Sequence, residues 1–336
     1  MTRAADVVVV RMSAMGDVVH SLGAIEALAR ARPGWRVHVA VQEEIAPLLC
    51  GLDHIASVVT HRRRPAVVGM LRSRRLLRRL RCDLALDLQG NWKSALAVRL
   101  SGARRRVGIA PPWRREPGSA RLLTELVPAT QEAAHPRRLA LDVVRHVAPD
   151  APDLLPRLVS TEAELAREAA ALQALGIDAE LPFLVLVLGP PRDNRSWPAG
   201  SAALEAAACP WPALVLLGPA EPSGMQVPPG VPLLRHGVGE LRRLVALGGL
   251  VARAGGRVVG PDQGPTHVLA ATGAEVTALY GAQDPDCTAS SAVRVLVRRD
   301  RPSCVPCRRR VCDHAEGPVC MQFQVATGEP PSPPLA

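Results

Sequence analysis

Aromatic side chains are scarce in this chain of 336 residues, at 2% of the total with one Tyr and two Phe. The apolar cores must therefore be built from Val, Leu and Ala. The scarcity also argues against a protein that stacks nucleic-acid bases on aromatic platforms. No apolar run approaches the roughly 20 residues that span a membrane, and no charged segment followed by an apolar one opens the chain. We therefore expect a cytoplasmic protein.

Acidic residues are also in deficit. The chain has 41 Lys+Arg against 31 Asp+Glu, a net charge of +10 and a pI near 10.1, and arginine greatly outnumbers lysine. Such an excess suits a polyanion, which can be nucleic acid, an anionic membrane surface or a phosphorylated substrate. The arginines are densest in the first half, above all in the segment 67–81. That segment reads as an amphipathic helix, which either is simply solvated or lies against an anionic surface.

The length predicts two domains of roughly 150 residues. We place an N-terminal domain at 1–150, a linker and connecting helix at 151–180, a C-terminal domain at 181–321 and a disordered tail at 322–336. A Pro/Asp cluster at 149–156 marks the linker, and Ser160 or Thr161 before Glu164 forms a capping box. Strands and helices alternate in both halves, which indicates an α/β fold. No GxGxxG follows the first strand of either half, which argues against a dehydrogenase.

The segment 7–33 is a strand, a short loop and a helix. Val7–Val10 reads as a buried strand, and the loop after it carries Ser13, Gly16 and Asp17. Ligands of open α/β sheets bind at the carboxyl ends of strands, which is where this loop lies. Asp17 can serve there as a functional carboxylate or as a helix cap.

Polar residues follow other predicted strands in the same way. Residues 84–88 lead into Gln89 and Lys93, and Lys93 either pairs with Asp87 or binds an anionic or hydroxylated substrate. An irregular Pro- and Arg-rich loop at 111–117 follows residues 107–109. In the second half, 183–188 leads to a polar loop at 190–198, and 213–217 leads to Gly218 and Glu221. The strand 257–259 leads to a loop at 260–267, where glycine and a following helix over 268–272 favour a phosphate. His267 either donates to that phosphate or caps the turn.

The motifs together resemble one known family. They are Ser13–His20, Asp87–Ala95, Arg115–Pro117, Arg195–Pro198, Asp262–His267, Tyr280–Pro285 and the cysteine-rich tail. Their order and spacing are similar to glycosyltransferase family 9, the ADP-heptose:lipopolysaccharide heptosyltransferases, and most of all to the heptosyltransferase I type. The resemblance extends from Val7 to about Met321.

The resemblance implies a GT-B fold, in which two doubly wound, Rossmann-like domains face each other across a cleft. It implies an inverting glycosyltransferase that moves heptose from ADP-heptose to the Kdo/inner-core region of lipopolysaccharide, without metal or other cofactor. The acceptor would be bound by the N-terminal domain and the nucleotide sugar by the C-terminal domain. Asp17 would be the general base. The anionic glycolipid acceptor would also bring the basic N-terminal domain into transient contact with the cytoplasmic face of the inner membrane.

The same resemblance assigns the remaining site residues. The donor-binding residues would be Ser13, Gly16, Arg195, Glu221, Asp262, Gln263, Gly264, Pro265 and His267. The acceptor-binding residues would be Gln89, Lys93, Arg114 and Arg115. Gln263 stands where the family usually has Ser or Thr, Arg195 stands in place of a lysine, and the family's final helix is reduced to the segment 322–336.

The tail also carries Cys304-x₂-Cys307-x₄-Cys312-x₇-Cys320, whose spacing resembles that of a zinc or iron–sulfur site. We expect unlinked thiols and no metal, and keep the four-cysteine metal site as the alternative. Three alternatives stay open for the function. They are a family 9-like transferase with another donor or acceptor, a degenerate non-catalytic paralogue, and a basic protein that binds nucleic acid.

Overall fold

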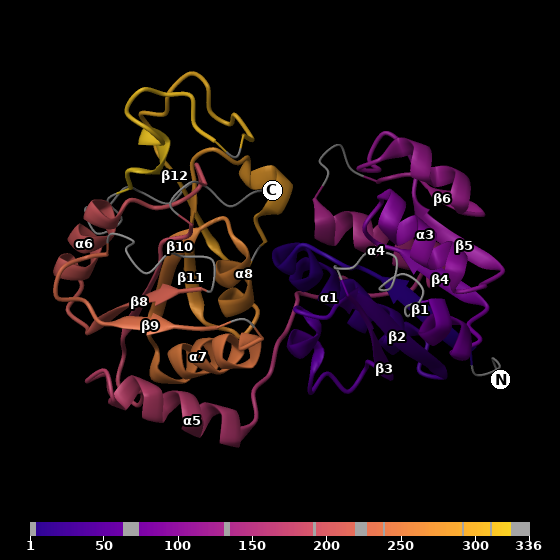
Figure 1. Cartoon of the computed structure of the whole chain (residues 1–336), viewed down its shortest axis with the longest axis horizontal. Coiled ribbons are helices and arrows are strands. Elements are labelled where there is room, and N and C mark those ends of the chain that lie inside the picture. The colour runs from indigo at the N-terminus through magenta and orange to yellow at the C-terminus, as the bar shows by residue number, and fades with distance from the viewer. Residues whose placement is uncertain are drawn as a thin grey trace. The chain divides into compact units, whose positions relative to one another are not determined.

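The chain divides into two compact units, Met1–Arg157 and Leu158–Ala336, here called unit 1 and unit 2 (Figure 1). The computed structural model describes residues 5–62, 74–130, 135–190, 193–218, 227–237, 239–290, 292–309 and 311–323. The boundary between the units falls within the segment 151–180 that the sequence marks as the connection. Each unit contains one parallel sheet of six strands with helices on both faces.

The sheet of unit 1 has the strand order β3-β2-β1-β4-β5-β6. Its strands are β1 (Ala5–Val10), β2 (Trp35–Gln42), β3 (Ser57–His61), β4 (Leu84–Asp87), β5 (Arg105–Ile109) and β6 (Glu125–Val127). The central strand β1 is β-branched and its residues 7–10 are fully buried, as a strand covered on both faces must be. It pairs in parallel with β2 on one side and β4 on the other.

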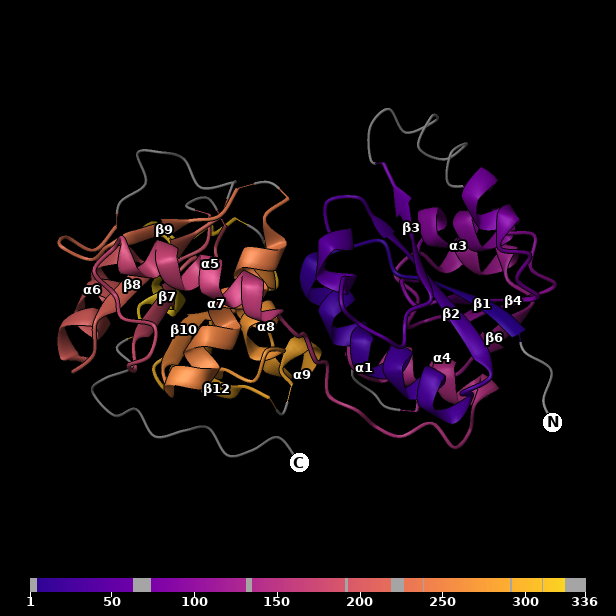
Figure 2. The same ribbon diagram turned by 90° about the horizontal axis from the view of Figure 1, so that it is seen from below.

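Helices cover both faces of this sheet. The helices α1 (Met15–Ala31) and α4 (Pro136–Val147) pack on each other, and they lie on the face opposite α3 (Trp92–Leu100) (Figure 2). The short 3₁₀ turns are η1 (Ala46–Leu49) and η2 (Pro117–Leu122). Of the basic helix expected at 67–81, the described part is helical at residues 74–79, and residues 67–73 lie outside the described residues.

The sheet of unit 2 has the order β12-β11-β10-β7-β8-β9. Its strands are β7 (Leu184–Val187), β8 (Ala213–Leu217), β9 (Leu233–Arg235), β10 (Arg257–Pro261), β11 (Glu275–Tyr280) and β12 (Arg294–Val297). Numbered within the unit, this is again the order 3-2-1-4-5-6. Both units therefore have the strand order of the nucleotide-binding Rossmann fold.

The helices of unit 2 are α5 (Glu162–Gln173), α6 (Ala199–Ala208), α7 (Leu241–Ala254), α8 (Gly264–Ala270) and α9 (Pro285–Thr288), with the 3₁₀ turn η3 (Val319–Met321). Thr161 and Glu164 form the capping box of α5, as the sequence predicts. One apolar cluster joins the sheet to Trp197, α6 and the C-terminal residues up to Phe323. The prediction of a disordered tail at 322–336 is wrong at its start, because Phe323 is fully buried in this apolar cluster, and residues 324–336 lie outside the described residues.

The strand order fixes where a ligand can bind in each unit. Neighbouring strands whose connections leave in opposite directions open a crevice at their carboxyl ends. In unit 1 these strands are β1 and β4, and in unit 2 they are β7 and β10. No helix in the described ranges is both long and apolar enough to cross a membrane.

Candidate active site

A pocket of about 290 Å³ lies at the carboxyl ends of β1, β4 and β5 in unit 1. Its lining combines charged and polar residues with an apolar wall: Arg11, Asp17, Asp87, Leu88, Gln89, Ile109, Trp113, Arg115, Pro136, Leu139 and Val143. This is the crevice that the strand order predicts. Asp17, the carboxylate on which the sequence analysis centres, lines it.

Asp17 lies in the first turn of α1, three residues after the N-cap position at Ala14. Its Oδ2 accepts a hydrogen bond from the backbone amide of Ala14 at 3.3 Å and pairs with Arg11 Nη2 at 2.9 Å. No hydrogen bond or ion pair reaches Oδ1 from the described residues. Asp17 therefore supports the helix start through one oxygen and keeps the other for a ligand, so the two roles expected for it are compatible.

Arg11 is a site residue that the sequence analysis did not identify. It follows β1, and its side chain is only 7% exposed. Besides its pair with Asp17, the guanidinium donates to the carbonyl oxygen of Leu88 after β4. Burial lowers the pKa of Arg11, and the charges of Asp17 and Asp87 oppose that shift. A cation placed directly after a run of four valines was the available signal, because such a charge must have a partner when it is buried.

The side chain of Gln89, in the loop after β4, forms hydrogen bonds with the loop after β1. Its Oε1 accepts a hydrogen bond from the Met12 amide at 2.8 Å, and its Nε2 donates to Ser13 Oγ at 3.3 Å. The expected acceptor residue Gln89 thus orders the loop that carries Asp17, and Ser13 is one of its partners. Gly16, expected with Ser13 at the donor, lies in the first turn of α1.

Arg114 does not have the place expected for it. We predicted that it faces the acceptor, but its side chain is completely buried and pairs with Asp87 Oδ2 at 2.5 Å. It also donates to Ser119 Oγ and the Ile109 carbonyl. The guanidinium fits because residue 108 is glycine, where a Cβ would lie 3.1 Å from Arg114 Nη1. The prediction was wrong because the sequence pattern does not show which of two adjacent arginines points inward.

Arg115 and Lys93 are the predicted acceptor-binding cations that remain available to a ligand. Arg115 is exposed, lines the pocket and makes no hydrogen bond or ion pair with the described residues. Lys93 is exposed in the first turn of α3, and it does not pair with Asp87, whose partner is Arg114.

Unit 2 brings two predicted donor segments together at its own crevice. Arg195 follows β7, and its Nη1 donates to the carbonyl oxygen of Asp262 after β10 at 3.2 Å. Its other nitrogens pair with Asp193, at 2.8 Å from Nε and 2.6 Å from Nη2. These bonds to Asp193 raise the pKa of Arg195. Arg195 is thus held beside the 262–267 loop. This position is the one required of a cation that binds a phosphate at that loop.

A buried polar group stands at the start of that loop. Asp262 Oδ1 lies 2.8 Å from His267 Nε2 and 3.4 Å from the Tyr280 hydroxyl. Burial acts to raise the pKa of Asp262, but the hydrogen bond and charge of His267 hold it below its usual value. The Nε2 atom of His267 is therefore engaged within the loop.

Two buried polar atoms of the loop have no hydrogen-bond partner among the described residues, Gln263 Nε2 and Thr266 Oγ1. The Gln263 amide packs on Gly189, where a Cβ would lie 2.5 Å from Nε2. Gly189 also has φ of +84°, which favours glycine. Gly264 and Pro265 form the first positions of α8, which begins four residues before the expected start. Glu221 lies outside the described residues.

The cysteine-rich tail packs on the same part of unit 2. Asn194 Nδ2 donates to Cys307 Sγ at 3.5 Å, and the backbone amide of Arg308 donates to the Ala282 carbonyl at 2.8 Å. All eight cysteines of the chain are free thiols, and burial raises the pKa of Cys320 to about 11. Within the described ranges, no three or more His, Cys, Asp or Glu side chains gather so that they could hold a metal ion.

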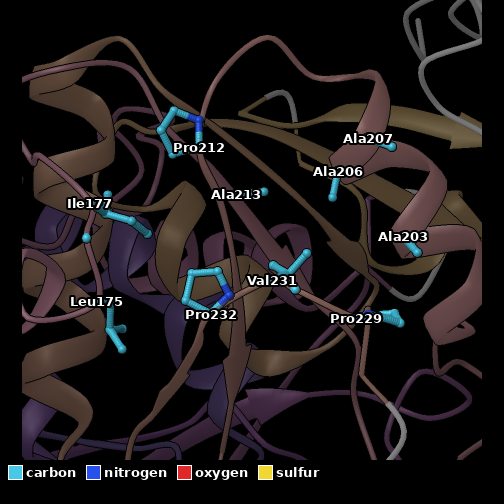
Figure 3. A pocket seen from close by; sticks show the side chains of 12 residues that line it. Leu175, Ile177, Ala203, Ala206, Ala207, Pro212, Ala213, Pro229, Val231 and Pro232 are labelled. Carbon is cyan, nitrogen blue, oxygen red and sulfur yellow. The ribbon is translucent and has the colours of Figure 1, made fainter.

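A larger pocket of about 440 Å³ lies at the opposite, amino edge of the unit 2 sheet (Figure 3). It is lined by aliphatic and proline residues before β7, β8 and β9, among them Ile177, Pro212 and Pro232. No titratable side chain lines it. The smaller pocket at Asp17 is therefore the candidate for chemistry.

Two Rossmann-type units with polar residues at their switch points are typical of α/β proteins that bind nucleotides. Residues 70–316 match the sequence model of glycosyltransferase family 9 (heptosyltransferase). The chain therefore belongs to glycosyltransferase family 9 and is a glycosyltransferase. It is also 28% identical over 330 residues to lipopolysaccharide heptosyltransferase 1 of Pseudomonas aeruginosa, across 92% of this chain and 87% of that protein.

Solved structures share the fold. A glycosyl transferase of family 9 from Veillonella parvula aligns with a TM-score of 0.72 and 15% identity, over 88% of both chains. The Escherichia coli heptosyltransferase WaaC, solved with ADP-2-deoxy-2-fluoro heptose, aligns with a TM-score of 0.65 and 20% identity, over 87% of this chain and 93% of that chain. These likenesses agree with the two Rossmann-like domains that the GT-B resemblance implies.

Proposed function

We propose that this protein is an inverting lipopolysaccharide heptosyltransferase, which moves heptose from ADP-heptose to the Kdo/inner-core region of lipopolysaccharide. The family membership and the similarity to a lipopolysaccharide heptosyltransferase support the class of donor and acceptor. Transfer proceeds without a metal or other cofactor, because protein side chains supply the base and the charges that the reaction needs.

The observation that carries this proposal is the position of Asp17. A general base must be ionised, lie in a pocket and keep one oxygen free for the proton that it removes. Asp17 lines the unit 1 pocket, and Arg11 and the Ala14 amide hold its Oδ2. Oδ1 is left to accept the proton of the acceptor hydroxyl as that oxygen attacks the anomeric carbon. Positioned proton transfer of this kind accelerates a reaction about 10²–10⁴-fold.

Acceptor binding is assigned to unit 1. Arg115 and Lys93 bring unpaired positive charge for the carboxylates and phosphates of the acceptor. Trp113 contributes to the apolar wall of the same pocket, on which the ring of a sugar can rest. Gln89 and the Arg114–Asp87 pair act indirectly, because they order the loops that carry the binding groups.

Donor binding is assigned to the crevice of unit 2. The unpartnered Gln263 Nε2 and Thr266 Oγ1 need a polar ligand, since a buried polar atom without a partner costs about 1–3 kcal/mol. The diphosphate of ADP-heptose offers acceptor oxygens for both. Arg195 adds a positive charge next to the same loop, in the place of the family's usual lysine. Ser13, Gly16, Glu221 and His267 stay predictions as donor-binding residues.

The test is product analysis with the purified full chain. ADP-heptose is supplied with Kdo₂–lipid A, and UDP- and GDP-sugars serve as control donors. We expect acceptor-dependent release of ADP and a product whose new linkage has the anomeric configuration opposite to that of the donor. Transfer only from another nucleotide sugar would overturn the donor assignment, and binding of ADP-heptose without any transfer would indicate a non-catalytic paralogue.

A further inference from the structure

The solvent-exposed side of α3 carries two large apolar residues between cations. Trp92 is 48% exposed and Leu96 is 36% exposed, one helical turn apart. Lys93 and Arg99 are exposed on the same helix, whereas Ala95, Ala97 and Val98 are buried against the sheet. We call Trp92, Lys93, Leu96 and Arg99 the α3 face. No acidic residue lies within this helix.

A second basic element lies beside α3. Leu77 of the helical residues 74–79 packs in the same apolar cluster as Ala97 and Val98 of α3, so both helices cover one face of the sheet (Figure 2). The outward residues of this short helix are four exposed arginines, at positions 74, 75, 78 and 79. We call residues 74–79 the arginine helix. The side chains of its arginines and of Arg99 make no hydrogen bond or ion pair with any described residue.

This surface borders the candidate active site. Trp92 is the first residue of α3, which begins directly after the loop that carries Gln89. The backbone amide of Trp92 donates to Glu116 Oε2 at 2.6 Å, and Glu116 adjoins the pocket-lining Arg115. The start of the α3 face therefore lies beside the loop whose Arg115 lines the Asp17 pocket.

We propose that the α3 face and the arginine helix form the surface with which unit 1 docks on an anionic lipid bilayer. The proposal deepens the proposed function at one step, because it uses an acceptor whose lipid part stays in the membrane. Docking on this face brings the Asp17 pocket next to the headgroups, from which the acceptor sugars project.

The chemistry of the surface favours lipid over nucleic acid. Unpaired arginines are attracted to anionic headgroups over roughly one Debye length, and each contributes about a fivefold increase in binding. Tryptophan prefers the headgroup region of a bilayer, where its apolar ring and polar N–H are both satisfied. Leu96 next to it can enter the acyl boundary, whereas a phosphate backbone offers an exposed leucine no partner.

The experiment is flotation of the full chain with vesicles of phosphatidylcholine alone or with phosphatidylglycerol. We expect binding only to the anionic vesicles. Arg75→Gln/Arg78→Gln/Arg79→Gln should weaken that binding about a hundredfold, and Trp92→Ser/Leu96→Ser should weaken it about tenfold at unchanged net charge. Circular dichroism verifies that each variant folds.

Matched controls come from unit 2. Arg294→Gln/Arg299→Gln/Arg301→Gln removes the same charge from exposed arginines, and Leu204→Ser/Leu233→Ser removes two exposed leucines. Both controls should bind vesicles within about twofold of wild type. Equal weakening by the two arginine triples would show attraction by net charge alone. Competition of a DNA duplex for the same arginines, with no effect of Trp92→Ser/Leu96→Ser on vesicle binding, would assign the surface to nucleic acid. Either result overturns the proposal.

A second readout separates this proposal from the proposed function. With acceptor dispersed in detergent, the docking variants should transfer heptose at the wild-type rate, and with acceptor in vesicles their transfer should fall with their binding. Vesicle binding through this surface without any heptose transfer would refute the proposed function and leave the surface in place. Transfer from vesicles that ignores all these substitutions would refute the surface and leave the function.

Discussion

At the scale of single residues, the account depends on how Arg11 holds Asp17. The guanidinium joins the Leu88 carbonyl to Asp17 Oδ2, so it connects the two loops of the switch point through the candidate base. Arg11 is a positioning residue, since it acts through Asp17. The sequence pointed to Asp17 through its loop and motif, and the cation directly after four valines was a signal for Arg11, but no local pattern could show the contact of Arg11 with Leu88, which joins positions 77 residues apart.

Arg11→Gln should lower kcat about 10- to 100-fold while the KM for ADP-heptose stays within twofold, because a displaced base loses alignment with the acceptor hydroxyl. Arg11→Lys keeps the charge and should recover at least half of the loss on a logarithmic scale. Steady-state kinetics of the three proteins provide the check. Arg11 would have only a structural role if both variants showed the same fall in kcat, a raised KM and a lower midpoint of urea unfolding.

The adjacent residues Arg114 and Arg115 should respond in opposite ways. Arg114→Met leaves the buried Asp87 carboxylate without its partner, so we expect a loss of about 3–5 kcal/mol in the free energy of unfolding of unit 1. Arg115→Met should leave stability unchanged and raise the KM for the acceptor. Urea unfolding and acceptor titrations separate the two. Stable Arg114→Met protein with impaired acceptor binding would restore the original assignment of Arg114.

At the scale of elements, apolar runs predicted β1, β4, β7 and β10. These are the strands whose carboxyl ends border the two crevices. The short strands β6, β9 and β12 were not predicted, since three or four residues are too few to show a pattern. The expected helix at 268–272 begins earlier, at Gly264, because Pro265 is favourable in the first turn of a helix. The sequence predicted the capping box of α5 correctly, because Thr161 and Glu164 are only three positions apart.

Glu164, a member of that capping box, also pairs with Arg242, and this ion pair gives a pH-dependent contribution to stability. The hydrogen bonds from Arg242 lower the pKa of Glu164 from 4.5 to about 2. A carboxylate with a lowered pKa in the folded state stabilises the fold fully above its unfolded pKa, and the contribution disappears as pH falls toward 2.

Glu164→Gln should therefore cost about 1 kcal/mol at pH 7, and the difference from wild type should shrink to nothing between pH 4.5 and 2. Urea unfolding of unit 2 across this range measures it. Glu162→Gln is the matched control, because Glu162 lies on the same helix and its ion pair with Arg253 of α7 is exposed and should contribute nothing measurable. A pH-independent difference for Glu164→Gln would contradict the assignment.

The loop after β7 needs glycine at position 189 to hold the Gln263 amide. Gly189→Ala would place a methyl group against Gln263 and strain a backbone with positive φ, so we expect affinity for ADP-heptose to fall at least about tenfold. Gly200→Ala is the control, because a Cβ there meets nothing within 4 Å. Calorimetric titration with ADP-heptose makes the comparison. Equal affinity of wild type and Gly189→Ala would remove Gln263 from the donor site.

At the scale of the whole molecule, the chain repeats one strand order in two units and places a distinct polar site at each switch point. The alternation of strands and helices predicted the two-domain α/β architecture, whereas the roles that the family motifs assign to the loops stay predictions. Burial could not be predicted in the same way. Whether Arg114 points into the core depends on the space that Gly108 leaves and on its ion pair with Asp87, which lies 27 residues away in the sequence.

The central claim is that Asp17 is the general base of heptose transfer. The most direct measurement is acceptor-dependent ADP release from ADP-heptose by wild type and Asp17→Asn, with the affinity for ADP-heptose determined in parallel. The account predicts that kcat falls at least about a hundredfold in Asp17→Asn while donor affinity is unchanged, since the amide occupies the same space but takes no proton. Turnover by Asp17→Asn within a few-fold of wild type would contradict it.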